Sequence, residues 1–158
     1  MRSVLTAMAM AATTASASDV EIKTDRFTGK TTASLVSSKA VDTTGVYLQP
    51  ATVFAVNRYK NPDGYSVQVA FVGNRWRYLQ CNKTYWLVDG KPYPMPAPGI
   101  VNQTLRGGVS EFFGFDLTAE QMNDLAQAKT IEFKVCADEY KLKDRGMLDI
   151  REINALKL

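Results

Sequence analysis

The chain has no histidine among its 158 residues. Histidine is the general base of triad-type serine and cysteine hydrolases and the commonest nitrogen ligand of zinc. Those centres are therefore excluded. The only two cysteines, Cys81 and Cys136, lie far apart in the sequence, so there is no Cys-x-x-Cys redox or zinc-ribbon motif. We predict no metal site and no cofactor.

An excess of charge of one sign is also lacking. The 19 lysines and arginines are nearly balanced by 16 aspartates and glutamates, and both signs are spread along the chain. A nucleic-acid interface needs a basic stripe, so none is predicted. Every apolar run falls short of the roughly 20 residues that cross a bilayer as a helix, so we predict no membrane span.

Residues 1–17 differ from the rest of the chain. Arg2 is followed by an uncharged apolar run from Val4 to Ala12 and by the small residues Ala15-Ser16-Ala17. This is the pattern of a cleaved signal peptide, with a mature chain starting at Ser18. No cysteine stands at that point, so no lipid anchor is predicted. We expect a periplasmic or secreted protein, with an amphipathic first helix or a lone membrane anchor as the alternatives.

An oxidising compartment favours a disulfide between Cys81 and Cys136. Closing so long a loop would stabilise the fold by roughly 4 kcal/mol in the chain-entropy model. Two separate buried thiols are the alternative, because the sequence does not show whether the two Cα atoms approach each other.

Alternating apolar and polar residues, separated by turn residues, predict antiparallel strands from Val46 onward. Asp89-Gly90 is a strong hairpin signal, and the prolines of Lys91–Gly99 should take that segment out of the sheet as an extended loop. Within residues 18–45, which we expect to be partly mobile, one strand is indicated near Ala33–Val36. The other predicted strands are Thr52–Tyr59, Tyr65–Phe71, Arg75–Cys81, Thr84–Val88, Lys91–Tyr93, Val109–Phe115, Thr130–Cys136 and Tyr140–Lys143.

Two helices are predicted near the C-terminus. Thr118 and Gln121 have capping-box spacing ahead of an apolar stripe, and a second helix begins at Asp144 with a stripe that includes Ile150 and Ile153. Strands followed by helices indicate an α+β fold. We predict one domain over residues 18–158, a mainly antiparallel meander sheet with both helices packed on one face.

Few residues suggest chemistry. Glu111 and Asp116 bracket a phenylalanine-rich strand, but their odd spacing puts them on opposite faces, so they are interpreted as a solvated rim charge and a helix-start charge. Two glycosylation sequons, at Asn82 and Asn102, fall in predicted turns or loops. The segment Gly29–Thr31 lacks the upstream glycine of a phosphate-binding loop.

Aromatic residues crowd the predicted meander. Tyr93 lies between two prolines in a stiff loop, and a rigid aromatic side chain loses little entropy on binding. Tyr93, with its neighbour Pro94 and the nearby Trp86, is the candidate binding site. Core packing is the alternative, because aromatic residues favour strands.

Several short segments together resemble a recurring layout of small exported bacterial proteins to which no activity is attached. They are Asp25–Gly29, Trp76–Leu79, Val88–Gly90, Leu117-Thr118 and Leu125–Phe133. The resemblance spans most of the mature chain, implies fold, export and bacterial origin, and brings no site residues with it.

The leading hypothesis is an exported, non-catalytic domain that binds another macromolecule, such as an envelope protein. Two alternatives stay open: a histidine-free glycan hydrolase of the envelope that uses carboxylates, and an inhibitor of a secreted hydrolase that inserts the proline loop into its target's cleft.

The first prediction concerns processing. The non-reduced protein from its own source should have the mass of a chain that starts at Ser18, less two hydrogens for one disulfide. Intact mass spectrometry measures both features. A mass that retains residues 1–17 and carries two thiols would contradict export.

Overall fold

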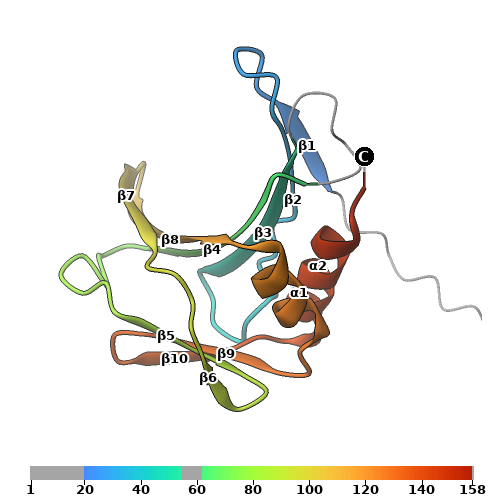
Figure 1. Cartoon of the computed structure of the whole chain (residues 1–158). Coiled ribbons are helices and arrows are strands. Elements are labelled where there is room, and N and C mark those ends of the chain that lie inside the picture. The colour runs from blue at the N-terminus through green and yellow to red at the C-terminus, as the bar shows by residue number, and fades with distance from the viewer. Residues whose placement is uncertain (1–19, 55–61, 158) are drawn as a thin grey trace, which may run out of the picture.

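The computed structural model describes residues 20–54 and 62–157. These residues form ten strands and two helices, arranged as two antiparallel sheets with the helices beside them (Figure 1). The predicted α+β fold is confirmed, although the strands are divided between two sheets. The predicted signal peptide lies outside the described residues.

The six-stranded sheet has the spatial order β1, β2, β3, β4, β8, β7. Its strands are β1 Glu21–Thr24, β2 Thr31–Ser34, β3 Val46–Phe54, β4 Gly64–Gly73, β8 Gly108–Leu117 and β7 Gly99–Leu105. The four-stranded sheet has the order β10, β9, β5, β6. It consists of β10 Asp138–Lys141, β9 Ile131–Val135, β5 Thr84–Val88 and β6 Lys91–Tyr93, and the helices are α1 Ala119–Gln127 and α2 Asp144–Ala155.

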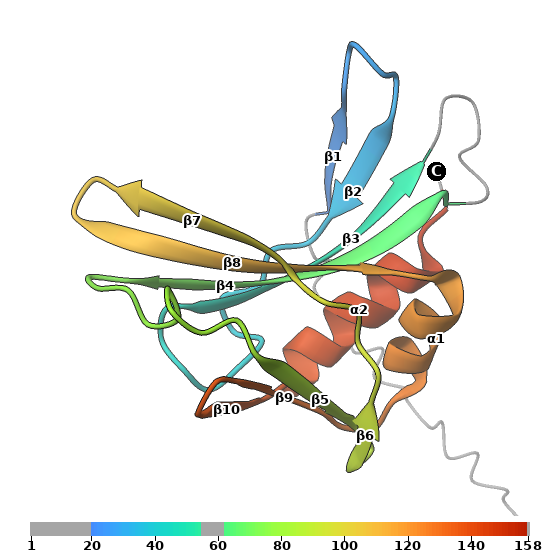
Figure 2. The same ribbon diagram turned by 60° about the vertical axis from the view of Figure 1, so that its left-hand side comes forward.

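The core lies between the large sheet and a second layer. Both helices and the small sheet cover the same face of the large sheet (Figures 1 and 2). Alternate residues of β4 and β8 point into this core, and each large apolar side chain buried there contributes about 1.5–3 kcal/mol. The core side chains include Val67, Val69, Phe71, Phe113, Phe115, Trp86, Phe133, Met122, Leu125 and Ile150.

Both helices begin at the predicted positions. Thr118 N donates to Gln121 Oε1 at 3.0 Å and Gln121 N donates to Thr118 Oγ1 at 3.1 Å, which completes the capping box of α1. Helix α2 begins at Asp144 and passes close to the connection between β2 and β3. A Cβ added at Gly146 would lie 3.0 Å from Ala40 Cβ, so glycine permits this approach.

The hairpin between β5 and β6 is also as predicted. Asp89 and Gly90 have φ angles of 50° and 75°, the left-handed conformation that a type I′ turn requires. Asp89 Oδ1 accepts hydrogen bonds from the backbone nitrogens of Thr130 and Lys129, each at 2.8 Å. These bonds lower the pKa of Asp89 and join the hairpin to the start of β9.

One strand prediction was wrong, the start predicted for the proline loop was too early, and one strand was missed. Arg75–Cys81 is an irregular loop, because some of its backbone groups bond to a distant side chain instead of to a strand. The chain leaves the small sheet only after Tyr93, since Lys91–Tyr93 pairs with β5 as β6. The strand β7 was not predicted, and it places the sequon residue Asn102 in a sheet rather than a loop.

The N-terminal part is more regular than expected. Two strands, β1 and β2, pair as a hairpin where one strand was predicted. The predicted strand Thr52–Tyr59 is the end of β3, which starts at Val46, and its residues 55–59 lie outside the described part of the chain.

The disulfide is confirmed. Cys81 and Cys136 are bonded, with Cα atoms 6.1 Å apart, and they are separated by 55 positions in the sequence. Cys81 ends the loop that leaves the large sheet, and Cys136 follows β9 of the small sheet. The bond therefore holds this loop to the small sheet.

This placement predicts a large stability effect. A double variant Cys81→Ala, Cys136→Ala should lose roughly 4 kcal/mol of unfolding free energy, because the unfolded chain is no longer cross-linked. Urea unfolding of the variant and of the oxidised protein measures the difference. A loss below about 1 kcal/mol would show that the chain-entropy term does not apply to this bond.

Candidate functional site

Trp86, one of the predicted binding residues, lies in the core. Its side chain is 3% exposed and stacks on Phe133, with ring centroids 5.0 Å apart. It also meets Phe115 edge to face at 5.2 Å. Trp86 joins the two sheets and presents no surface to a partner.

Tyr93 and Pro94 lie nearer the surface, against helix α1. Tyr93 Oη donates to Asp124 Oδ2 at 2.9 Å, and Gln121 Nε2 donates to Pro94 O at 3.3 Å. Partial burial, followed by the carboxylate of Asp124, raises the pKa of Tyr93 to about 12. The proline loop is thus held on α1, and a binding role for Tyr93 and Pro94 stays a prediction.

Glu111 was misjudged as a solvated rim charge. Its side chain is 1% exposed and lies on the core face of β8. Its two oxygens accept hydrogen bonds from the backbone nitrogens of Arg77 and Tyr78, each at 2.8 Å. Asp116, on the opposite face, is exposed as predicted. The two carboxylates therefore do not converge on one site.

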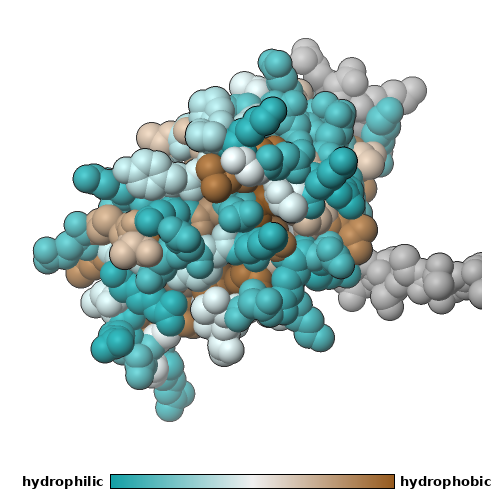
Figure 3. All heavy atoms as spheres, turned by 90° about the horizontal axis from the view of Figure 1, so that it is seen from below, coloured by the Kyte–Doolittle hydropathy of each residue, from teal (hydrophilic) through white to brown (hydrophobic). Residues whose placement is uncertain are grey.

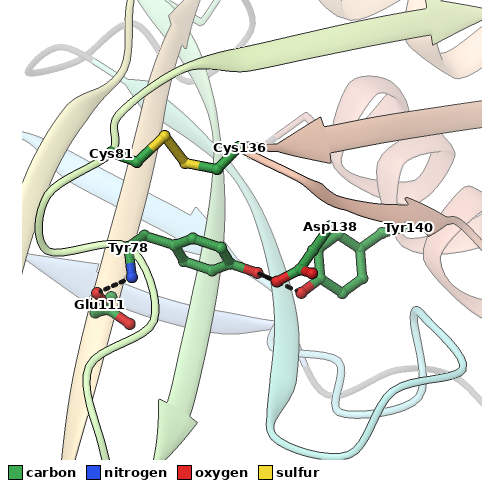
Figure 4. The surroundings of a disulfide bond; sticks show 6 residues. All are labelled: Tyr78, Cys81, Glu111, Cys136, Asp138 and Tyr140. Carbon is green, nitrogen blue, oxygen red and sulfur yellow. Dashed lines mark hydrogen bonds between the residues drawn. A yellow bond between two sulfur atoms is a disulfide. The ribbon is translucent and has the colours of Figure 1, made fainter.

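Tyr78 is the centre of a polar cluster beside the disulfide (Figure 4). Its hydroxyl donates to Asp138 Oδ2 at 2.7 Å and lies 2.6 Å from Tyr140 Oη. Burial, together with these neighbours, raises the pKa of Tyr78 well above its usual value. Through these two contacts Tyr78 joins the irregular loop to β10.

A second buried carboxylate, Asp149, lies on α2 with no side-chain exposure. Arg145, one turn earlier, forms an ion pair with Asp149 Oδ1 at 2.9 Å, and Ser37 also faces the carboxylate. Burial outweighs these contacts and raises the pKa of Asp149. The carboxylate lies between α2 and the connection between β2 and β3. Because it is fully buried, it is not accessible to a partner.

The outer face of the small sheet is predominantly hydrophilic (Figure 3). Oppositely charged residues face each other across β9 and β10, with Lys134 Nζ 2.9 Å from Glu139 Oε1 and Lys141 Nζ 3.9 Å from Glu132 Oε1. Such cross-strand pairs stabilise sheet pairing. They surround the exposed Tyr85 and indicate a solvated face.

The edges of the two sheets differ in how they are protected. Exposed edges invite pairing with another chain, and proteins blunt them with charge, proline or short length. Strand β10 carries three charges in four residues, β6 is three residues long with Pro92, and β1 has four residues that include Glu21 and Lys23. These three edges are protected.

Strand β7 has none of these features. It is seven residues long, has the sequence GIVNQTL without charge or proline, and is exposed throughout. It pairs with β8 along its whole length, which leaves its other edge at the margin of the large sheet (Figure 2). The side chains of Ile100, Val101 and Leu105 are 37%, 60% and 40% exposed. This edge is the candidate binding site.

No family model, curated protein or solved structure matches the chain. Within residues 20–54 and 62–157, no group of three or more cysteines and carboxylates is placed to hold a metal ion. No helix in those ranges has the length and apolar character needed to cross a bilayer.

Glu111 yields a prediction about stability. Glu111→Gln should destabilise the fold by about 1–3 kcal/mol, because the amide keeps one acceptor oxygen and turns a donor toward the other backbone N–H. The control is Asp116→Asn on the exposed face of the same strand, expected to change stability by less than about 0.5 kcal/mol. Urea unfolding compares them. Equal effects would mean that the bonds to Arg77 and Tyr78 contribute nothing specific.

Proposed function

We propose that the protein is an exported, non-catalytic binding domain that takes up an extended polypeptide segment as a new strand along β7. One observation carries the proposal: β7 is a long, uncharged, exposed edge, whereas the other three sheet edges are protected. A partner strand would make the large sheet seven-stranded.

Strand addition suits the chemistry of this edge. An edge strand has backbone N–H and C=O groups that a partner strand can satisfy, and each such bond contributes about 0.5–1.5 kcal/mol net. Alternate side chains supply contacts on both faces of the ladder. Ile100 and Val101 point to opposite faces and are both exposed, so a partner would bury apolar surface on each side.

The catalytic alternative needs two carboxylates that converge on one site, and Glu111 and Asp116 do not converge. The carboxylate of Glu111 already accepts hydrogen bonds from two backbone N–H groups, and Asp116 lies on the opposite, exposed face of β8. The inhibitor alternative needs a protruding proline loop, but Pro94 and Tyr93 bond to α1. These contacts favour a binding domain whose site lies elsewhere.

Export is the other part of the proposal. The signal-peptide pattern of residues 1–17 supports it, and so does the Cys81–Cys136 bond, because disulfides persist in oxidising compartments. An unfolded or extended segment of an envelope or secreted protein is the kind of partner that such an edge would meet there.

The test uses two matched variants. Val101 on β7 and Val36 after β2 are 60% and 62% exposed. Peptides of about 12 residues are selected by display on the wild-type protein, and the affinity of the best one is measured for Val101→Lys and Val36→Lys. A lysine on the edge should weaken binding at least about tenfold, or about 1.4 kcal/mol, while Val36→Lys should bind as the wild type does.

Amide hydrogen exchange locates the bound peptide. Protection of residues 99–105 on binding is expected. Protection elsewhere, or wild-type affinity in Val101→Lys, would contradict strand addition at β7. Sedimentation without peptide tests whether a second copy of the chain occupies the edge. A dimer that Val101→Lys abolishes would assign the edge to that second copy and would also contradict the proposal.

A further inference from the structure

The loop between β4 and β5 is irregular but firmly held. Glu111 accepts hydrogen bonds from the backbone N–H groups of Arg77 and Tyr78 in this loop. The disulfide holds the loop at Cys81. The ring of Tyr78 packs edge to face on Phe71, with centroids 4.7 Å apart. A buried carboxylate and the disulfide therefore both serve to fix one stretch of loop, and fixed loops commonly carry function.

This loop presents three large polar or aromatic side chains. Arg75 and Arg77 are exposed, and Trp76 between them is half-buried. They line one side of an open depression of about 840 Å³. Asp138 and Glu139, the first two residues of β10, line the other side. None of these lining residues belongs to β7.

The charged side chains that line the depression differ in whether they already have an oppositely charged partner. Glu139 forms an ion pair with Lys134 at 2.9 Å, and Asp138 accepts a hydrogen bond from the Tyr78 hydroxyl at 2.7 Å. The guanidinium of Arg77 faces tyrosine hydroxyls rather than a carboxylate. Arg75 has no hydrogen bond or ion pair with any residue in the described ranges. Both arginines thus lack an acidic partner.

We propose that this depression binds a carboxylate-bearing sugar, at a site separate from β7. The two guanidiniums suit a carboxylate, to which arginine donates two parallel hydrogen bonds. The indole of Trp76 offers a flat surface for the apolar face of a sugar ring. Asp138 and Glu139 retain acceptor capacity for sugar hydroxyls, and Thr43 lines the same depression.

The two carboxylates distinguish a sugar acid from other anions. A phosphate group carries close to two negative charges and has few donors to offer, so Asp138 and Glu139 would repel it. A sugar acid brings one charge for the arginines and several hydroxyl donors for the acids. Because the loop is already fixed, little entropy is lost in ordering it around the ligand.

Tryptophan fluorescence provides the test. Trp76 is half-buried at the depression, whereas Trp86 is 3% exposed in the core. Titration with D-glucuronate should give a saturable change in emission in the roughly millimolar range expected for a ligand of this size. Methyl glucoside, its neutral counterpart, should give none. The variant Trp76→Phe should lose the signal.

Two arginine variants locate the contact. Arg75→Gln should weaken glucuronate binding at least about tenfold, while Arg26→Gln, an exposed arginine in the turn between β1 and β2, should not change it. Circular dichroism and the melting temperature show whether Arg75→Gln is folded. Val101→Lys should bind glucuronate like the wild type, so failure at β7 and failure here are separable.

Three results would overturn the inference. They are no response to glucuronate, an equal response to methyl glucoside, and a response that inorganic phosphate reproduces in wild type and Arg75→Gln alike. The last would mean that any anion is attracted without a defined site.

Discussion

Two hydrogen bonds from backbone N–H groups to the carboxylate of Glu111 determine where the chain goes after it leaves the large sheet. The carboxylate lies on the core face of β8, in line with Phe113 and Phe115, where an unpaired acid would be costly. Arg77 and Tyr78 satisfy it. Without these bonds, the acid and the N–H group of Tyr78 would be buried unpaired.

The packing of the small sheet follows from this contact. The loop that Glu111 holds leads directly into β5, and its Cys81 is bonded to Cys136 at the end of β9. Tyr78 adds a hydroxyl contact to Asp138 beside the same disulfide. Three different interactions thus bring the small sheet under the large one. The aromatic contacts between Trp86, Phe115 and Phe133 then fill the space between the two sheets.

Elements specified by neighbouring residues were predictable from the sequence. The capping box at Thr118 and the Asp89-Gly90 turn act over a few positions, and alternation identified β4, β5 and β9. The loop at Arg75–Cys81 was not predictable, because it alternates like a strand and its deciding partner, Glu111, is more than 30 positions away. Strand β7 was missed because its sequence, GIVNQTL, does not alternate between apolar and polar residues. The candidate binding edge depends on that strand, so it could not be found from sequence.

The two proposed sites depend on one strand for opposite reasons. On one side β8 pairs with β7 and supports an edge whose backbone groups face outward. On its core face β8 carries Glu111, which fixes the loop of Arg75 and Arg77. An edge must stay exposed to be extended, while a loop must be fixed to recognise a small ligand without an entropic cost. Strand β8 is also paired with β4 along nine residue pairs, so both sites rest on a strand that is paired along both of its edges, and the bonds from Arg77 and Tyr78 allow it to carry a buried acid.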